Sequence, residues 1–590
     1  MESAAAISLA LSFYLLLLSA TLAESTSPTR PRNGAHPSGT NHKYSFLKDA
    51  SRSPPAKQYD YIIVGGGAAG CAMAATLSAK HSVLLLERGG VPYGVSTIER
   101  VDGFHVNLLD YDNYTSVAQG YRSEDGVLSH RGRVLGGGTA LNAGFYTRAS
   151  RAEVAMFGWE PELVEQGYRW VEAKVAFKPV VPEWQAALKA AMIQSGVVPD
   201  NGFTYEHLVG SKVGGTIFDP QGKRHTAADL LEYATPANTR VLIHATVHKV
   251  LFDPASVKSG KPRAVGVSYT DKLGGSHTAT LAPRGEVIVS SGAVGSPQLL
   301  QLSGIGPKSE LSALGIPLVL DHPQVGQAMA DNPNNVFFSA GSTEQPYSLV
   351  NVAGITEFGS YIEELSAGQN TTGLIQCFVQ MLKDPAKLVN PAYLELVRSP
   401  PDFVLPYLPQ LTYVVQKVSG PFSKGFLRLK TTDVRDNPIV RYNYYQHPRD
   451  LAVCVQAVKV ISKTVRAPAF HKFSYQKASQ VPQNLAFVLQ AASGFIPPAD
   501  TSNDTALAQY CVDSVVTIWH AHGGCLVGGV VDKEHRVIGT EALRVIDIST
   551  FNSTPGANPQ ATVMMLGRYM GLRMMQQRKQ EELEAAGREH

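Results

Sequence analysis

The sequence has little cysteine, little tryptophan and little charge for its length. Five cysteines and four tryptophans are spread over 590 residues, and charged residues make up 17% of the chain. So few cysteines exclude a small disulfide-held scaffold, and their odd number leaves at least one thiol unpaired. Lys and Arg (52) nearly balance Asp and Glu (49), and no basic run carries interleaved aromatic residues. The charge pattern therefore predicts no nucleic-acid partner.

Long apolar runs are absent from the sequence after its N-terminus. Residues 7–18 form an apolar core, and small residues up to Ala23 precede a polar stretch. This pattern predicts a signal peptide of residues 1–23 and a secreted protein, extracellular, in the cell wall or in the endoplasmic reticulum lumen. The segment contains no Lys or Arg and approaches the about 20 residues of a membrane helix, so a signal anchor is the alternative. No later segment is long enough to span a membrane.

The next part of the chain changes character abruptly. Residues 24–57 are rich in Ser, Pro and small polar residues, which predicts a flexible lead-in with little structure. From Tyr59 to Glu87 the sequence reads as strand, glycine turn, Ala-rich helix and second strand. Such a pattern is typical of a βαβ unit with buried parallel strands, so we expect an α/β fold of the Rossmann-like type.

The glycine turn carries the first chemical signal. Gly65, Gly67 and Gly70 have the G-x-G-x-x-G spacing, and Glu87 ends the second strand. The first glycine permits the tight turn, the second lets the backbone approach a pyrophosphate, and the third lets helix and strand pack closely. An acid at the end of the second strand is typical of a group that binds an unphosphorylated ribose. The motif therefore predicts FAD or NAD rather than NADP.

A second glycine-rich segment spans residues 131–142 (RGRVLGGGTALN). It is too rich in glycine for a core strand, and we interpret it as backbone that closely approaches a planar ligand. A flexible surface loop is the alternative if this segment is taken alone.

Six segments, in order, resemble the glucose–methanol–choline (GMC) family of flavin oxidoreductases, in its plant branch of HOTHEAD-like proteins and mandelonitrile lyases. They are residues 59–70, 84–90, 131–144, 292–306, 519–529 and 544–571. The pattern of the chain and this resemblance imply a discontinuous FAD-binding domain with an inserted α+β substrate-binding domain. The expected ranges are 58–154, 226–314 and 515–575 for the FAD-binding domain, 155–225 and 315–514 for the substrate-binding domain, and 576–590 for a charged tail.

The resemblance also implies which residues bind the cofactor. FAD is expected to be non-covalent, because Leu141 stands where some relatives attach it through a His. The expected pyrophosphate and adenosine contacts are Gly65, Gly67, Ala68, Ala69, Gly70, Glu87, Arg88 and Val247. The expected flavin and ribityl contacts are Val134, Gly138, Asn142, Ala143, Gly144, Phe145, Trp519, His520, Asp547, Asn558, Pro559 and Gln560.

His520 is the expected catalytic base. An imidazole is a natural base near neutral pH, since its ordinary pKa is about 6.5, and the resemblance places His520 at the base position. His520 and His522 also have a His-x-His spacing, but no further ligand set surrounds them, so we expect no metal. The resemblance makes Asn558 the second catalytic residue, whose amide would hydrogen-bond the substrate oxygen. It also implies a disulfide between Cys454 and Cys511.

The resemblance leads to a primary alcohol as substrate, with ω-hydroxy fatty acids of cuticle or pollen-wall polymers as the expected class. Hydroxynitrile lyase activity with a structural FAD is the first alternative. Such lyases usually carry His at position 558 and Tyr two residues before the base, whereas this chain has Asn558 and Ile518. A non-catalytic secreted flavin-binding protein is the second alternative. We expect a monomer, and sequons make Asn113, Asn370, Asn503 and Asn552 candidate glycosylation sites.

Overall fold

The structure is a computed structural model that describes residues 43–52, 58–112, 114–385, 402–491, 495–556 and 558–588. All of them belong to the unit formed by residues 41–590. The predicted signal peptide and the sequon at Asn113 lie outside the described residues.

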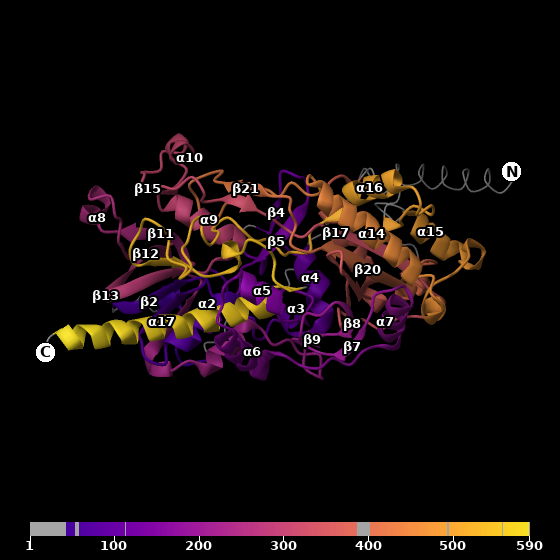
Figure 1. Cartoon of the computed structure of the whole chain (residues 1–590), viewed down its shortest axis with the longest axis horizontal. Helices are drawn as coiled ribbons and strands as arrows, with labels where there is room; N and C mark the ends of the chain where they lie inside the picture. Colours follow the sequence, from indigo (N-terminus) through magenta and orange to yellow (C-terminus); the bar gives the residue numbers. More distant parts are fainter. Residues whose placement is uncertain are drawn as a thin grey trace, which may run out of the picture. The chain divides into compact units, whose positions relative to one another are not determined.

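The first sheet has eight strands and contains the predicted βαβ unit (Figure 1). Its strand order is β1-β10-β3-β2-β13-β12-β11, and β24 pairs with β13. The strands are β1 (Leu47–Asp49), β2 (Tyr59–Val64), β3 (Val83–Leu86), β10 (Thr239–Ile243), β11 (Thr246–Phe252), β12 (Ala264–Thr270), β13 (Ser276–Val289) and β24 (Leu543–Val545). β1, β10, β3, β2, β13 and β24 run parallel to one another, whereas β12 pairs antiparallel with both β13 and β11.

Both faces of the parallel part are buried, which explains its nearly continuous apolar strands. Ile63 and Leu85 point into a core shared with helices α2 (Ala68–Leu77) and α17 (Gln560–Arg588). Ile62 and Leu84 point into a second core, with β11 and β12. The α/β class predicted from the sequence is therefore confirmed.

The lead-in prediction is wrong for residues 43–52. β1 pairs in parallel with β10 and forms an edge of the first sheet. Tyr44, Phe46 and Leu47 are buried, and the ring of Tyr44 stacks on that of Phe46. A strand of three residues carries too little periodicity to be recognised, and pairing with β10 supplies its order.

The second sheet has seven strands in the order β23-β17-β20-β19-β18-β8-β7 (right half of Figure 1). They are β7 (Asp200–Phe203), β8 (Gly210–Val213), β17 (Asn334–Ala340), β18 (Val352–Ile355), β19 (Ser360–Leu365), β20 (Leu411–Val418) and β23 (Val515–Val516). One face packs on helices α7 (Glu183–Gln194), α14 (Pro448–Thr464) and α16 (Asp504–Asp513). The expected disulfide is confirmed, since Cys454 of α14 is bonded to Cys511 of α16.

The segment 155–225, expected to belong wholly to the substrate-binding domain, is divided between the two cores. Helix α6 (Pro161–Val175) buries Tyr168 and Val171 in the core of the first sheet. α7 instead packs in the core of the second sheet. The boundary expected at residue 155 is therefore wrong for α6, because the helix covers α17 rather than the second sheet.

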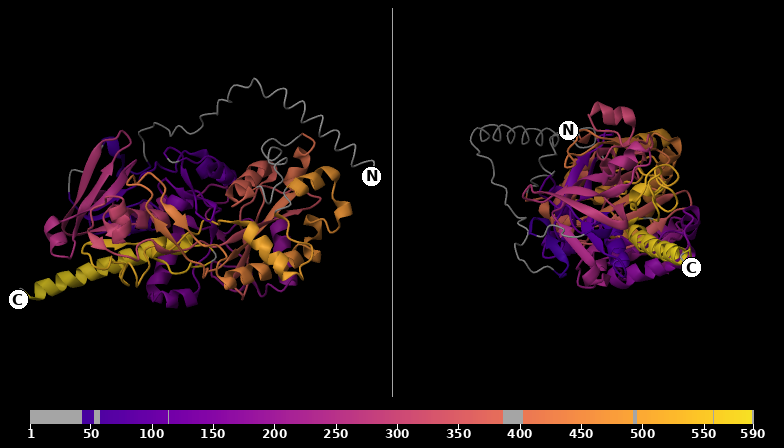
Figure 2. Two further views of the ribbon diagram at one scale, coloured as in Figure 1. Left: turned by 90° about the horizontal axis from the view of Figure 1, so that it is seen from above. Right: turned by 90° about the vertical axis from the view of Figure 1, so that its left-hand side faces the viewer.

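Helix α17 continues without a break through the expected boundary at residue 576. Arg578 pairs with Asp60 of β2 at 2.8 Å, so this part of the expected tail is attached to the first sheet. Its last turns project beyond the sheet in the left view of Figure 2, and residues 579–585 are exposed. The helix is therefore packed at its beginning and solvated at its end.

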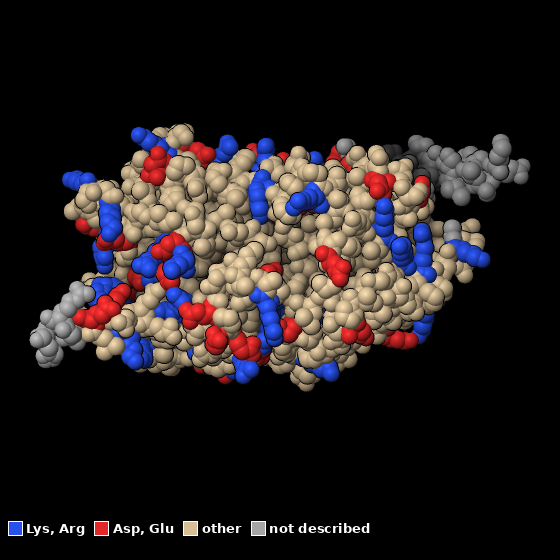
Figure 3. Space-filling view, in the orientation of Figure 1, with Lys and Arg blue, Asp and Glu red and all other residues tan. Residues whose placement is uncertain are grey.

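The surface mixes charges of both signs. Acidic and basic side chains are interspersed on the face shown in Figure 3. None of the helices in the described part of the chain combines the length and hydropathy that a membrane span requires. The three unpaired cysteines, Cys71, Cys377 and Cys525, are all buried.

Candidate active site

A cavity of about 350 Å³ lies between the two sheets. On one side it is lined by residues at the carboxyl ends of β2 and β3, among them Gly65 and Glu87. On the other side it is lined by Glu363 and Leu365 of β19 and Val415 of β20. Because ligands of open α/β sheets bind at the carboxyl ends of the strands, the cavity has the expected place for a dinucleotide.

The glycine turn fits a pyrophosphate. Gly65 has φ +106°, and a Cβ there would lie 2.4 Å from the carbonyl oxygen of Ser290. A Cβ on Gly70 would lie 2.0 Å from the carbonyl oxygen of Gly65. A Cβ on Gly67 would meet no atom within 4 Å. The outer glycines are thus required by packing, while Gly67 leaves an open cradle at the N-terminus of α2, where helix N–H groups bind phosphate.

Glu87 and Arg88 hold the two glycine-rich segments in place. The Glu87 carboxylate accepts hydrogen bonds from the backbone N–H groups of Gly66 (2.9 Å) and Gly89 (2.8 Å). Arg88 donates to Gln119 Oε1 at 2.6 Å and to the carbonyl oxygen of Gly132. Both side chains also line the cavity. They can therefore support the turn and face the adenosine at the same time.

The second glycine-rich segment touches the first. A Cβ on Gly137 would lie 2.8 Å from Cα of Gly67, and Gly136 N–H donates to the carbonyl oxygen of Gly66 at 2.7 Å. Gly138, like Gly67, faces open space. The segment is thus packed against the cradle and is not a free surface loop.

Most of the expected cofactor residues line this one cavity. They are Gly65, Gly67, Ala68, Ala69, Glu87, Arg88, Gly138, Asn142, Ala143, Gly144, Phe145, Val247, Trp519, His520, Asp547, Asn558, Pro559 and Gln560. Gly70 and Val134 do not line it: Gly70 packs beneath the turn, and Val134 is fully buried and bridged to Gly90. The open space beside Gly67 at the N-terminus of α2 and the cavity that continues from it fit the pyrophosphate and the two ends of FAD.

Residues 142–145 are held by side chains from distant parts of the chain. Asn142 Nδ2 donates to Gln560 Oε1 at 2.8 Å, and Gln560 Nε2 donates to the carbonyl oxygen of Phe145 at 2.7 Å. The guanidinium of Arg224 donates to the carbonyl oxygen of Asn142 at 2.7 Å. Nothing in its sequence neighbourhood marks Arg224, and sequence reasoning missed it.

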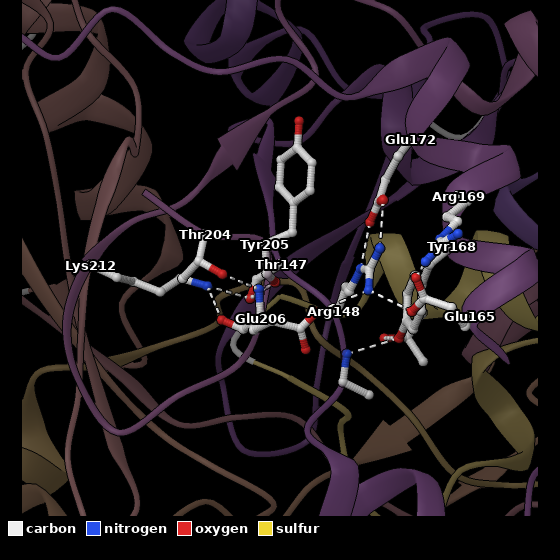
Figure 4. A network of polar contacts seen from close by, with 12 residues as sticks. Thr147, Arg148, Glu165, Tyr168, Arg169, Glu172, Thr204, Tyr205, Glu206 and Lys212 are labelled. Atoms are coloured by element: carbon white, nitrogen blue, oxygen red, sulfur yellow. Dashed lines mark hydrogen bonds and ion pairs between the residues drawn. The ribbon is translucent and has the colours of Figure 1, made fainter. Parts of the chain in front are cut away.

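The chain just after Phe145 is fixed by the network in Figure 4. Arg148 forms two hydrogen bonds to Glu172, at 2.7 Å each, and pairs with Glu165 and Glu206. The buried Lys212 donates to Thr147 Oγ1 at 2.8 Å. This network attaches Thr147 and Arg148 both to α6 and to β8.

Asp547 closes the other side of the cradle. Its carboxylate accepts hydrogen bonds from the backbone N–H of Gly292 (2.8 Å) and from the hydroxyl of Ser296. Both donors belong to α9 (Gly292–Leu302), so Asp547 holds the start of that helix at the cavity. Burial raises the pKa of Asp547 above its ordinary value.

His520 lies on the loop after β23, and Asp331 fixes its backbone by a hydrogen bond. Its N–H donates to Asp331 Oδ1 at 2.9 Å, and Asp331 Oδ2 accepts from the hydroxyls of Tyr444 and Thr517 at 2.6 Å each. Nδ1 of His520 has no hydrogen-bond partner within the described residues. Burial, followed by the nearby charge of Lys417, lowers the pKa of His520 well below its ordinary value. The imidazole is therefore neutral and can accept a proton.

The two other histidines near His520, His130 and His522, are also neutral, because burial lowers the pKa of each. Trp519 Nε1 donates to Nδ1 of His130 at 3.2 Å, and burial lowers the pKa of His130 to about 4. His522 is fully buried, with Nδ1 near the His520 carbonyl oxygen (3.0 Å) and the Thr554 hydroxyl (3.0 Å). These contacts fit a structural role for His522. Within the described residues no cluster of His, Cys, Asp or Glu could hold a metal ion.

Asn558 lines the same cavity as His520. Its Oδ1 accepts a hydrogen bond from Lys417 Nζ at 3.1 Å, and Lys417 pairs with Glu363 Oε1 at 2.8 Å. Sequence reasoning missed both charged residues. The signal that could have found them is a charged side chain inside a segment rich in β-branched, aromatic and aliphatic residues, as Lys417 in LTYVVQKV; SYIEEL gives a weaker signal because three of its six residues are polar.

Asp331 is expected to be needed for the position of His520. Asp331→Leu leaves three buried donors without an acceptor, and each costs about 1–3 kcal/mol. We expect a lower melting temperature and a kcat/KM reduced about 10- to 100-fold, because a small misplacement of a catalytic group has effects of this size. Asp331→Asn keeps an oxygen acceptor for the His520 N–H, and the Tyr444 and Thr517 hydroxyls can turn to accept from its amino group. It is the control, with kcat/KM close to wild type. Equal losses in both variants would contradict this role.

Comparisons with known proteins agree with this geometry. Family models described as GMC oxidoreductase match residues 59–334 and 421–567. The chain is 42% identical to Protein HOTHEAD of Arabidopsis thaliana, over 97% of this chain and 99% of that protein. It is 46% identical to the (R)-mandelonitrile lyase-like protein of Arabidopsis thaliana, over 90% of this chain and 92% of that protein. It is 41% identical to sinalpyl alcohol oxidase Nec3 of Nesocodon mauritianus, over 92% of this chain and 93% of that protein.

Solved structures show the same fold. The formate oxidase of Aspergillus oryzae RIB40 superposes with a TM-score of 0.70 at 17% identity, over 90% of this chain and 100% of that one. The cavity, its two glycine-rich walls and these matches lead to one conclusion: the chain belongs to the GMC oxidoreductase family and is an FAD-dependent oxidoreductase that acts on CH–OH groups.

Proposed function

We propose that this enzyme oxidises a primary alcohol, with His520 as the base and Asn558 as the hydrogen-bond donor to the substrate oxygen. The observation that carries the proposal is that a neutral, buried imidazole and an amide line one cavity together with the FAD cradle. His520 accepts the hydroxyl proton, and Asn558 steadies the oxygen as negative charge develops on it. FAD, when bound, supplies at N5 the acceptor for the substrate hydride.

The walls of the cavity favour an apolar substrate. On the side of the second sheet they include apolar side chains from several elements. These are Phe104, Leu108, Val350, Leu365, Phe378 and Val415. Such walls suit an alkyl chain or an aromatic ring. We propose a long-chain ω-hydroxy fatty acid as the substrate class, by analogy with HOTHEAD-like relatives, in a secreted and monomeric enzyme whose disulfide suits an oxidising compartment.

Hydroxynitrile cleavage is the second candidate, because a mandelonitrile lyase-like protein is a relative at 46% identity. In that reaction His520 would deprotonate a cyanohydrin without net oxidation. Asn558 and Ile518 favour the oxidase, since the lyases usually carry His and Tyr at these positions.

One experiment separates the two. Purified holoenzyme is mixed anaerobically with 16-hydroxyhexadecanoic acid, with benzyl alcohol and with mandelonitrile in separate cells, while the flavin absorbance and cyanide are recorded. Bleaching of the flavin by either alcohol is the expected result. Cyanide release from mandelonitrile with no bleaching by any alcohol would overturn the proposal in favour of the lyase.

A further inference from the structure

A buried ion pair stands directly behind Asn558. Lys417 on β20 and Glu363 on β19 have side chains that are 0% and 1% exposed, and their charged groups lie 2.8 Å apart. In the register of the sheet Lys417 is opposite Tyr361, and Glu363 is opposite Val415. Residues two apart on a strand share a face, so both charges point to the face of the sheet that lines the cavity.

The contact with Lys417 determines which way the amide of Asn558 faces. A lysine ammonium has three donors and no acceptor, so the amide atom 3.1 Å from Nζ must be the oxygen. The amino group Nδ2 is then on the opposite arm of the amide. Because Asn558 lines the cavity, this arm is the one that can donate to a substrate oxygen.

Glu363 allows Lys417 to remain charged in this place. A buried ammonium without a partner is strongly disfavoured, and burial does lower the pKa of Lys417. The carboxylate of Glu363 opposes that effect and gives the pair no net charge. A donor bond from an ammonium to the amide oxygen also polarises the amide, which makes its N–H a stronger donor.

We propose that Glu363 and Lys417 are positioning residues, which hold the Asn558 amide with Nδ2 toward the substrate oxygen. This inference rests on the proposed function, in which Asn558 binds that oxygen, and deepens it. The pair acts through Asn558 and does not itself touch the reacting atoms.

The test is a double-mutant cycle with holoenzyme. E363Q/K417M removes the donor to Asn558 while keeping the net charge of the pair at zero. Because it also removes the Lys417 charge that lowers the pKa of His520, all variants are compared on the pH plateau where His520 is unprotonated. With the alcohol that reduces the wild-type flavin, kcat should fall about 10- to 100-fold and KM should change less, because the amide bond strengthens in the transition state. In an N558A background the same double change should alter kcat less than about twofold, since its target is already absent.

A binding measurement gives a readout without turnover. The dissociation constant of benzaldehyde is measured from the change it causes in the flavin spectrum. It should rise about 3- to 10-fold from the wild type to E363Q/K417M. It should be the same in N558A and in the triple variant N558A/E363Q/K417M. D200N/K189M is the matched control, because it removes a lysine–carboxylate pair with a contact of 2.6 Å on α7 and β7 that does not line the cavity. It should bind benzaldehyde like the wild type.

The outcomes separate the two proposals. Equal losses of kcat with and without Asn558, or a wild-type kcat and dissociation constant in E363Q/K417M, would overturn the positioning role. If E363Q/K417M does not fold, E363Q alone is used, and it should show the same dependence on Asn558. A wild-type enzyme that reduces no flavin with any alcohol but shows the expected benzaldehyde pattern would refute the proposed function and support the positioning role.

Discussion

His520→Ala is expected to lower kcat/KM for the alcohol by about 10²- to 10⁴-fold, the usual contribution of a general base. The imidazole has no partner at Nδ1 among the described residues and is neutral, which suits the proposed role of accepting a proton better than a role in holding neighbouring side chains. We therefore expect the variant to keep its FAD and its melting temperature. Rapid anaerobic mixing, with flavin reduction as the signal, measures the loss.

The pH profile provides the matching control. Burial and Lys417 lower the pKa of His520 well below its ordinary value, so the base stays unprotonated as the pH falls. In the wild type kcat/KM should remain level as the pH falls through about 6.5, where an ordinary imidazole would take up a proton, and should decline only at lower pH. A decline centred near the ordinary pKa, or a His520→Ala variant with more than about a tenth of wild-type kcat/KM, would refute the assignment of the base.

Gly67→Leu is expected to give a folded protein without FAD. Gly67 has φ −84° and ψ −159°, a conformation open to any residue, and a Cβ there meets no atom within 4 Å. The leucine side chain would instead extend into the cradle where the pyrophosphate binds. We expect FAD binding at least about 100-fold weaker, which corresponds to about 2.7 kcal/mol. Visible flavin absorbance per mole of protein and circular dichroism measure the two properties.

Two variants frame this result. Gly67→Ala adds one methyl group and should retain more FAD than Gly67→Leu. Gly70→Leu should not fold normally, because its Cβ would lie 2.0 Å from the carbonyl oxygen of Gly65. If Gly67→Leu were purified with one FAD per chain, the pyrophosphate would have to bind elsewhere.

The local motifs of this site could be predicted from the sequence because their geometry depends on neighbouring residues. Gly65 and Gly67 lie in the turn between β2 and α2, and Gly70 lies in the first turn of α2. All three fall within six residues, so the shape of the turn follows from their own backbone freedom and small size. The position of Glu87 could be predicted in the same way, because it comes directly after the second strand of the βαβ unit. The disulfide Cys454–Cys511, in contrast, came from the resemblance and not from any local pattern.

The two wrong predictions, for residues 43–52 and for the boundary at residue 155, both concern contacts between segments far apart in the sequence. β1 is a strand of three residues whose order comes from β10, nearly 200 residues away. α6 and α7 follow one another within the segment 155–225, yet α6 packs on α17 and α7 on the second sheet. Local sequence contains no information on which of two apolar surfaces a helix will cover.

The sequence by itself determined the FAD cradle and, through resemblance, the histidine of the site. Only the tertiary structure brought Asp331 under His520, Arg224 to Asn142, and the Glu363–Lys417 pair behind Asn558. The physical reason is distance along the chain. A turn is stabilised by its own few residues, whereas an ion pair or a hydrogen bond between segments more than 50 residues apart exists only once two buried surfaces have packed together.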